Sequence, residues 1–336
     1  MARRRISKQQ KTRIQAIQQK RRDRLESHAE AALADAGERP PCEGRVIIRH
    51  GATLGVLDED GELILCQTRQ NIGHPVCGDR VILQPTGETG GVVTALLPRE
   101  SVLSRPDFSG RDKPLAANLT QLVVVLAPKP EPSGYLLEQY LVTAEIIRVK
   151  PLIAVNKIDL LAGAAATAFF RELEHYNAIG YPRVEVSAKR DHGLDALIER
   201  LKDETSILVG QSGVGKSSLI NALLPDHDVE TGRLSQATGL GRHTTSAATL
   251  YRLPQGGELI DSPGVRSFRL TDLSRSELEQ GFPEFRPYLG QCRFHNCTHE
   301  HEPGCAVRAA MDEGRISPRR LENFLRLSRG VKGRSG

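Results

Sequence analysis

The chain has 336 residues, enough for two or three domains of roughly 100–200 residues each. Hydrophobic residues make up only 39 %, so we expect a very polar or unfolded segment beside the compact domains. No apolar run approaches the ~20 residues that span a bilayer, and no hydrophobic signal region follows Met1. We therefore expect a cytoplasmic protein without a membrane partner.

The net charge of +5 is concentrated at the N-terminus. Residues 1–25 contain ten Lys and Arg against the single acid Asp23, a formal charge of +9, so the remaining residues carry −4. A basic arm of this density is suited to phosphate backbones, which it binds by releasing counterions. We predict that residues 1–40 form a disordered tail that engages RNA; a tail that only solubilises or targets the protein is the alternative.

Residues 43–103 contain short apolar runs separated by turn residues. Runs such as 45–49, 62–66 and 80–83 have the composition of strands, and Gly-rich or Asp-rich segments separate them. Four or five strands within about 60 residues predict a small β-barrel of the OB-fold type. This architecture often binds nucleic acid, but the fold alone does not establish that function.

A linker rich in turn residues is expected at 104–114, before a region of α/β rhythm at 115–275. Apolar strands alternate there with helical patterns, such as one at 162–178. The expected strands are 121–126, 152–155, 183–186, 206–209 and 258–260. Each of the last four leads into a polar motif. Because the carboxyl ends of parallel strands meet at one edge, we expect these motifs to form one crevice.

The most informative motif follows the strand at 206–209. It fits the phosphate-binding loop, in which glycines turn backbone N–H groups onto phosphate oxygens. Lys216 is expected to reach the outer phosphates, and the Ser217 hydroxyl is suited to Mg²⁺, next to the positive end of a new helix. The predicted nucleotide-binding residues of this loop are Gly210, Gln211, Ser212, Gly213, Val214, Gly215, Lys216, Ser217 and Ser218.

The motifs after two other strands predict which base is bound. The carboxylate of Asp159 can accept two hydrogen bonds from the N–H edge of guanine, a pair of donors that adenine lacks. We expect Asn156 to steady the loop, the Lys157 stem to cover the ring, and the Ala188 N–H to meet the guanine carbonyl. The predicted base-binding residues are Asn156, Lys157, Ile158, Asp159, Ser187, Ala188 and Lys189.

The motif Asp261-Ser-Pro-Gly264 follows the last predicted strand. Asp261 is expected to hold Mg²⁺ through water. The Gly264 N–H is expected to sense the terminal phosphate, which is how switch loops register hydrolysis.

The last region, 276–330, contains a cluster of metal-binding residue types. Three of the six cysteines lie there, which indicates metal binding in a reducing compartment. Three thiolates and one imidazole form the donor set of a closed structural Zn²⁺ site, and His295 and His301 are spare candidates for the imidazole. A basic amphipathic helix at 319–329 would contact RNA or pack on this module. The candidate zinc ligands are Cys292, Cys297, His299 and Cys305.

The order of the motifs is unusual. In most GTPases the phosphate loop comes first, whereas here 156–159 and 187–189 precede 210–218, and 261–264 comes last. This order resembles that of a circularly permuted GTPase. With its N-terminal barrel and late Cys/His cluster, the chain closely resembles the RsgA/YjeQ family of small-ribosomal-subunit biogenesis GTPases over about residues 43–310.

The resemblance implies a multidomain protein: tail, OB-fold barrel, circularly permuted α/β GTPase domain and C-terminal zinc-binding module with helices. It implies GTP or GDP and Mg²⁺ as ligands, with one structural Zn²⁺. It also implies binding to the small (30S) ribosomal subunit and its rRNA. We expect the chain to act as a monomer, although the sequence does not specify the oligomeric state. GTP hydrolysis would be stimulated by that subunit during late assembly.

The family's switch motif resembles Gly241-Arg-His243-Thr244-Thr245. One of the two threonines, with Thr245 favoured over Thr244, would close on Mg²⁺ and the terminal phosphate. Val265 follows the Asp-x-x-Gly motif, where Ras-like proteins have a water-orienting Gln, so we expect slow intrinsic hydrolysis. We hypothesise that His243 supplies the missing function when a partner orders the loop.

Two other classes of function are left open by the sequence. One is a nucleotide-gated RNA-binding module with little turnover of its own, which hydrolysis measurements with and without small subunits would identify. The other is a P-loop ATPase in which 156–159 is a chance match, for which ATP would compete with GTP.

Overall fold

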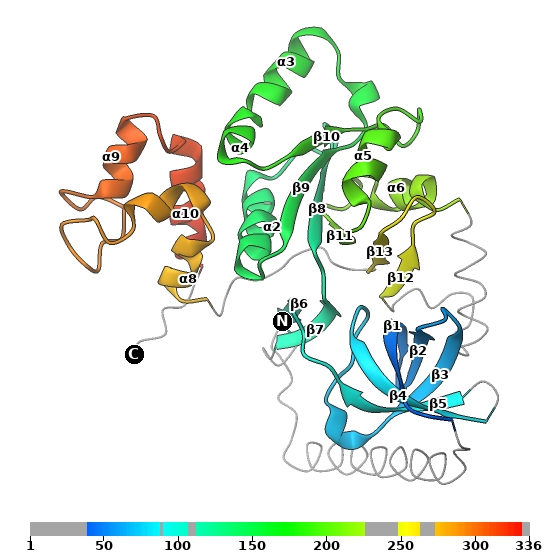
Figure 1. Ribbon diagram of the computed structural model, residues 1–336. Coiled ribbons are helices and arrows are strands. Elements are labelled where there is room, and N and C mark those ends of the chain that lie inside the picture. The colour runs from blue at the N-terminus through cyan, green and yellow to red at the C-terminus, as the bar shows by residue number, and fades with distance from the viewer. Residues whose placement is uncertain (1–38, 88–89, 107–111, 226–247, 263–272, 331–336) are drawn as a thin grey trace, which may run out of the picture. The chain divides into compact units, whose positions relative to one another are not determined.

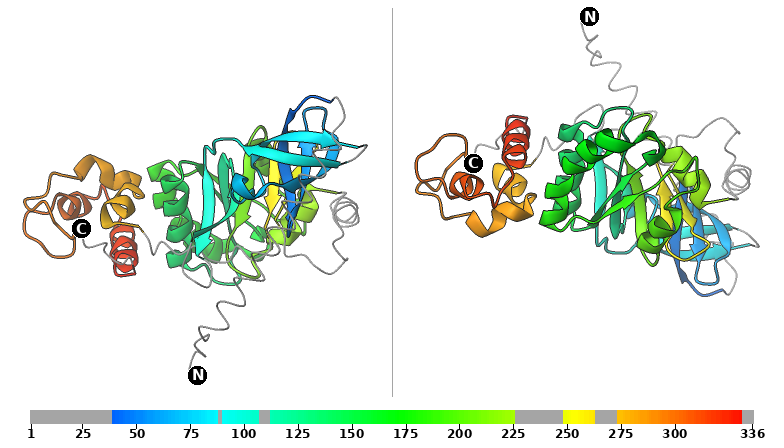
Figure 2. Two further views of the ribbon diagram at one scale, coloured as in Figure 1. Left: turned by 90° about the horizontal axis from the view of Figure 1, so that it is seen from below. Right: turned by 90° about the horizontal axis from the view of Figure 1, so that it is seen from above.

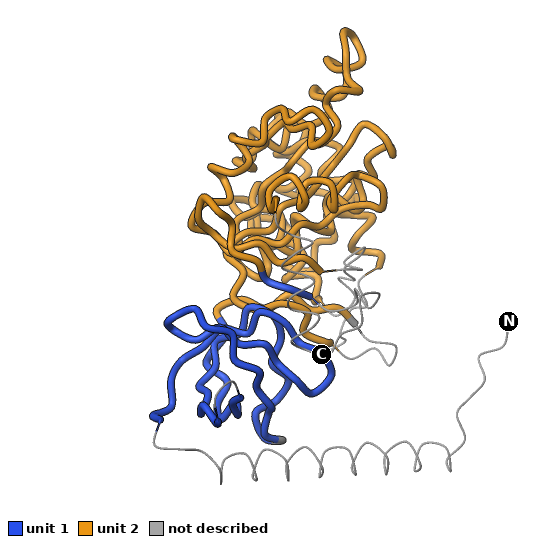
Figure 3. Tube along the Cα trace, turned by 90° about the vertical axis from the view of Figure 1, so that its right-hand side faces the viewer, with its two compact units in different colours: residues 1–99, 228–250 blue, residues 100–227, 251–336 orange. Residues whose placement is uncertain are grey.

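The computed structural model describes residues 39–87, 90–106, 112–225, 248–262 and 273–330. They form two compact units, drawn in different colours in Figure 3. The first contains the N-terminal barrel, and the second contains the α/β region and the C-terminal helices (Figure 1). Residues 1–38 of the predicted tail (1–40) lie outside the described residues. The boundary predicted at 275, inside the second unit, stays a prediction.

The first unit is a closed β-barrel. Its strands are β1 (Cys42–His50), β2 (Thr53–Asp58), β3 (Leu63–Thr68), β4 (Arg80–Thr86) and β5 (Gly90–Leu96), with a short 3-10 helix, η1 (Gln70–Ile72), after β3. These described strands pair in the order β1-β2-β3-β5-β4, and β4 pairs back with β1. Closure of the sheet pairs both edges, which confirms the predicted barrel.

The segment 104–114, expected as a linker, lies largely in a β-hairpin. Strands β6 (Val102–Pro106) and β7 (Asp112–Ala117) pair antiparallel, with Val102 opposite Ala117. The strands extend beyond the turn-rich segment on both sides, where Leu103 and Ala116 are fully buried. The linker prediction was therefore wrong for the described residues of this segment.

The second unit is built on a parallel sheet. Its strands are β8 (Gln121–Leu126), β9 (Lys150–Val155), β10 (Arg183–Glu185), β11 (Thr205–Val209) and β13 (Glu258–Asp261); β12 (Thr249–Arg252) precedes β13. The five run parallel in the order β10-β9-β8-β11-β13. Every residue of β8 and β11 is buried, as expected for central strands covered on both faces.

Helices cover both faces of this sheet. They are α2 (Gly134–Ile146), α3 (Gly163–Arg171), α4 (Glu174–Ile179), α5 (Leu194–Leu201) and α6 (Lys216–Leu223). Helices α2, α3 and α4 lie on one face, and α5 and α6 on the other (Figures 1 and 2). The single helix expected at 162–178 is two helices. The break turns buried Leu173 and Tyr176 toward the core, whereas α3 buries no residue.

Helix α2 is buried on two sides. Its residues from Leu137 to Ala144 are all buried, including the polar Glu138, Gln139 and Thr143. One side packs on β8 and β9, and the other packs on C-terminal helices. The sequence pattern revealed only the first of these sides.

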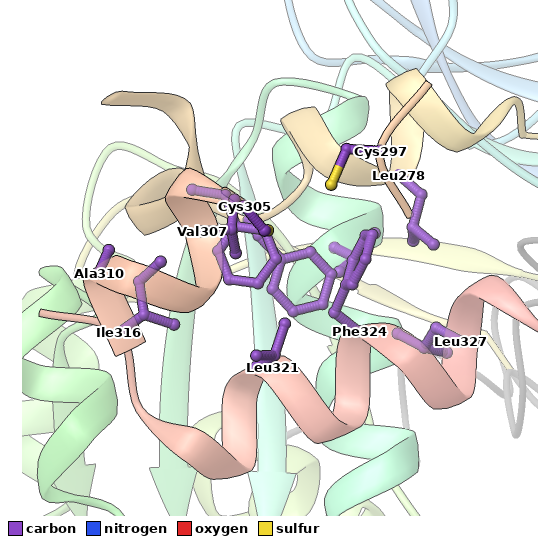
Figure 4. Close-up of a cluster of buried hydrophobic side chains, with 12 residues drawn as sticks. Leu278, Cys297, Cys305, Val307, Ala310, Ile316, Leu321, Phe324 and Leu327 are labelled. Carbon is purple, nitrogen blue, oxygen red and sulfur yellow. The ribbon is translucent and has the colours of Figure 1, made fainter. Parts of the chain in front are cut away.

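The C-terminal region is a small helical module. It consists of α8 (Arg275–Gln280), the 3-10 helix η3 (Pro283–Tyr288), α9 (Ala306–Asp312) and α10 (Pro318–Ser328). Phe282, Phe285 and Phe324 form its aromatic centre, with ring centroids 5.0 to 5.3 Å apart. Leu321 and Leu327 join it from α10 (Figure 4). The apolar face of α10 therefore packs on its own module.

A buried arginine joins this module to the α/β region. Arg320 on α10 is fully buried and forms two ion-pair contacts with Glu284, of 2.6 and 3.0 Å, and a third with Glu138 on α2. Glu138 also accepts hydrogen bonds from Tyr176 (2.8 Å) and Asn323 (3.1 Å). Four elements thus share one charge network. Among the described helices, none combines the length and apolar character needed to cross a bilayer.

We expect Arg320→Ala to destabilise the protein by about 3–5 kcal/mol, because it leaves two carboxylates without their cation. Urea unfolding measures this change. The matched control is Arg329→Ala, which removes an exposed pair with Glu300 and is expected to cost about 0–1 kcal/mol. Equal midpoints for the two variants would contradict the importance of the buried network.

Candidate functional site

The motifs predicted from the sequence gather at one edge of the parallel sheet. Asn156 directly follows β9, Ser187 lies just after β10, Gly210 directly follows β11, and Asp261 is the last residue of β13. Since the strands are parallel, these four positions lie at neighbouring strand ends. The four motifs that were expected to form one crevice therefore follow strands at the same edge of the sheet.

The side-chain amide of Asn156 joins two of these loops. Its Nδ2 donates to Val214 O at 3.0 Å, and its Oδ1 accepts the backbone N–H of Ala188 at 3.2 Å. Asn156 is only 1 % exposed, so water cannot replace these partners without opening the site. One buried amide thus fixes the spacing between the phosphate loop and the loop at 187–189.

The phosphate loop has a conformation that requires glycine at two close contacts. Gly210 and Gly215 have φ values of 146° and 94°. A Cβ at Gly210 would lie 2.3 Å from Val125 O, and one at Gly215 would lie 2.4 Å from Asn156 Nδ2. Neither position has space for a methyl group. The loop therefore presents backbone rather than side chains to a ligand, as phosphate binding requires.

Two lysines contact the phosphate loop from different elements. Lys157 donates from Nζ to Gly213 O at 2.5 Å and to Lys129 O at 3.0 Å. Lys216, the first residue of α6, donates to the carbonyls of Gly210 and Gln211, both at 2.8 Å. The Lys216 ammonium therefore lies at the loop, where it can meet phosphate oxygens at the N-terminus of a helix.

The carboxylate of Asp159 lies beside the loop at 187–189. The buried Ser187 donates from Oγ to Asp159 Oδ1 at 2.5 Å, and this hydrogen bond lowers the pKa of Asp159. The carboxylate therefore stays ionised, as an acceptor for the N–H edge of a base. The N–H of Ile158 donates to Val186 O at 3.3 Å, which ties the two loops together by backbone as well.

Other predicted site residues differ in how far the structure describes them. Ser217 and Ser218 are exposed in the first turn of α6, Ser212 is exposed within the phosphate loop, and Lys189 is exposed beyond Ala188. Asp261 is half-buried at the end of β13. The remaining predicted residues lie outside the described part of the chain: His243, Thr244, Thr245 and Gly264.

A further loop belongs to the site, although the sequence analysis assigned it no role. It follows β8 and contains Lys129, whose carbonyl accepts the Lys157 ammonium. Ser133, at the end of this loop, donates its N–H to Gln211 Oε1 at 3.0 Å. Its only signal in the sequence was its position after a buried strand, because its contacts use backbone atoms.

The four candidate zinc ligands come together in the C-terminal module. Their ligand atoms all lie within 4.8 Å of one another. His299 Nδ1 is 3.3 Å from Cys305 Sγ and 3.7 Å from Cys292 Sγ, and the two sulfurs are 3.9 Å apart. Thiolates about 2.3 Å from a tetrahedral Zn²⁺ would lie about 3.8 Å apart, so this cluster could hold a metal ion. His295 and His301 are exposed and lie outside it.

Comparison with known proteins identifies the family. A model of the RsgA GTPase family matches residues 96–271, just over half of the chain. The chain belongs to the RsgA GTPase family. Its ligand is therefore a guanine nucleotide with Mg²⁺, and the chain is a GTP hydrolase. The resemblance inferred from the motif order is confirmed.

Individual relatives extend this similarity to nearly the whole chain. The chain is 46 % identical to the small ribosomal subunit biogenesis GTPase RsgA of Azotobacter vinelandii, with 96 % of each chain covered. The Hahella chejuensis protein of the same name is 45 % identical, covering 99 % of this chain and 97 % of that one.

Solved structures support the same assignment. The crystal structure of YjeQ from Thermotoga maritima has a TM-score of 0.73 and 35 % identity, covering 88 % of this chain and 100 % of that one. The structure of YloQ, described as a circularly permuted GTPase, has a TM-score of 0.71 and 30 % identity, covering 89 % of this chain and 97 % of that one. The permuted order of loops is thus confirmed for the fold.

We expect Asn156→Asp to weaken GDP binding by about 10–100-fold, because it removes the donor to Val214 O and leaves that carbonyl unpaired at a cost of about 1–3 kcal/mol. Titration with a fluorescent GDP analogue measures the affinity. The control is Asn177→Asp, at an exposed position of α4. Affinity unchanged in both variants would show that the bridge does not hold the site together.

Proposed function

We propose that this chain hydrolyses GTP on the small (30S) ribosomal subunit and acts as a late-stage assembly factor that contacts rRNA. The relatives from Azotobacter vinelandii and Hahella chejuensis carry the name small ribosomal subunit biogenesis GTPase. The observation that carries the proposal is the Asn156 bridge, which joins the phosphate loop to a base loop that precedes it in sequence.

The described residues support defined roles in nucleotide binding. Ionised Asp159 accepts hydrogen bonds from the two N–H groups of guanine. Adenine lacks this pair of donors, so a buried or desolvated carboxylate would have no partner beside adenine. Backbone N–H groups of residues 210–218 and the Lys216 ammonium bind phosphate oxygens. The Ser217 hydroxyl would bind Mg²⁺ and Asp261 would hold it through water; when bound, Mg²⁺ supplies positive charge that neutralises the phosphates.

Replacement of Asp159 by Asn should exchange guanine for xanthine specificity. An amide can donate to the second carbonyl of xanthine, which replaces the guanine amino group, and it loses the paired acceptors that guanine requires. Competition binding with GDP and XDP measures the preference, with the exposed Asp312→Asn on α9 as control. A variant that still prefers GDP would exclude Asp159 as the base-reading residue.

The hydrolytic step is proposed to depend on residues outside the described ranges. Val265 cannot orient a water molecule, so His243 would act once the subunit orders its loop, with Thr244 or Thr245 on Mg²⁺ and Gly264 at the terminal phosphate. We expect His243→Ala to reduce subunit-stimulated hydrolysis by about 10²–10⁴-fold, the range for general acid–base catalysis, without weakening GDP binding. Stimulated hydrolysis at the parental rate would remove this assignment.

We further propose that Cys292, Cys297, His299 and Cys305 hold one structural Zn²⁺. The donor set and the sulfur spacing support this metal, and four protein ligands leave no position for a catalytic water. The basic tail and the exposed arginines of α10 are proposed to contact rRNA, and the protein to act as a cytoplasmic monomer.

A nucleotide-gated RNA-binding module is the alternative function. The decisive measurement is GTP hydrolysis by the purified chain with and without small ribosomal subunits, with large subunits as the control. We expect small subunits to increase the rate of GTP hydrolysis and large subunits to leave it unchanged. Subunit binding that depends on the nucleotide but does not increase turnover would support the alternative instead.

A further inference from the structure

The ring of His299 has two nitrogens that face different chemistry. Nδ1 faces the thiols of Cys292 and Cys305, whereas Nε2 lies 3.4 Å from Oε1 of Glu279 on α8. That separation is slightly longer than a typical N–H···O bond. The His299 side chain is only 5 % exposed and that of Glu279 only 16 %, so neither group is well placed to exchange its partner for water.

The carboxylate of Glu279 is itself fixed in place. Arg275, one turn earlier on α8, places Nε 3.2 Å from the same Oε1. Arg275 also donates to the carbonyl of Thr298, the residue before His299, and its guanidinium lies 5.5 Å from the ring centroid of Phe324. Arg275 therefore contacts both the Glu279 carboxylate and the backbone next to His299, and it holds the two in place.

The backbone conformation of His299 is unusual. His299 has a φ of 58°, in the left-handed region that residues with a Cβ seldom adopt. Such a conformation persists only where the surroundings fix it. Glu302 contributes by accepting the N–H of Thr298 at 2.7 Å.

We propose that Glu279 is a positioning residue of the metal centre. By accepting the Nε2–H of His299, it holds the tautomer whose Nδ1 lone pair points toward the metal, and it makes the ring a stronger donor. This inference rests on the proposed Zn²⁺ site. It also joins α8, the first described helix after the Asp261 motif in the sequence, to a metal ligand by a side-chain contact.

The test compares zinc affinities of full-length variants by competition with a chromophoric chelator. Glu279→Leu, which has no acceptor, should bind Zn²⁺ about 10–100-fold more weakly than the parent. Glu279→Gln retains an acceptor oxygen and nearly the same volume, so its loss should be smaller. Glu313→Gln, at an exposed position paired with Arg315 in the same module, should match the parent.

A second measurement reads the tautomer directly. Long-range ¹H–¹⁵N NMR spectra of the zinc-loaded parent should show His299 bound through Nδ1 and protonated at Nε2, and Glu279→Leu should alter the Nε2–H signal. Affinity of Glu279→Leu within about twofold of the parent, or ligation through Nε2, would overturn the role of Glu279. A parent chain that binds no Zn²⁺ would overturn the metal site as well. If Glu279→Leu does not fold, the zinc affinity of Glu279→Gln relative to the parent decides whether Glu279 positions His299.

Discussion

The nucleotide site depends on the buried amide of Asn156. The loop at 210–218 is proposed to bind phosphates and the loop at 187–189 to contact the base. Asn156 joins these two loops, which are separate in the sequence, through Val214 O and the Ala188 N–H. Gly215 is required because its Cβ would occupy the place of that amide. These loops follow strands of one parallel sheet, so they meet at one edge although their order along the chain is permuted.

A second constraint links this crevice to the C-terminal module. Ser133, the N-cap residue of helix α2, contacts Gln211 of the phosphate loop, and Glu138 within the helix pairs with Arg320. Helix α2 and its N-cap residue therefore contact both the phosphate loop and the C-terminal module. The cluster of Cys292, Cys297, His299 and Cys305 lies in the same module, where the ring centroid of His299 is 5.9 Å from that of Phe324.

Local patterns were sufficient for elements that carry their own signal. Strands such as β8 and β11 are continuous apolar runs, and the Lys216 and Asp159 motifs follow such strands. Sequence patterns predicted the wrong element where residues are buried by a segment that is distant in the sequence. The hairpin of β6 and β7 reads as a linker because turn residues outnumber its few buried apolar positions, and the helix at 162–178 contains no letter that marks its break at Leu173.

The sequence by itself indicated the chemistry proposed for this protein: a carboxylate expected to read guanine, a phosphate-loop motif, a group of three Cys and one His suited to a metal, and the permuted order of these motifs. Each of these motifs consists of particular residue types at short spacing along the chain, so it can be recognised without knowledge of the fold. Only the tertiary structure decided that Glu138 and Arg320 are buried together, that Lys129 O supports the nucleotide loops, and that Glu279 faces His299. These contacts join residues remote in sequence or use backbone atoms, and folding alone brings them within hydrogen-bond range.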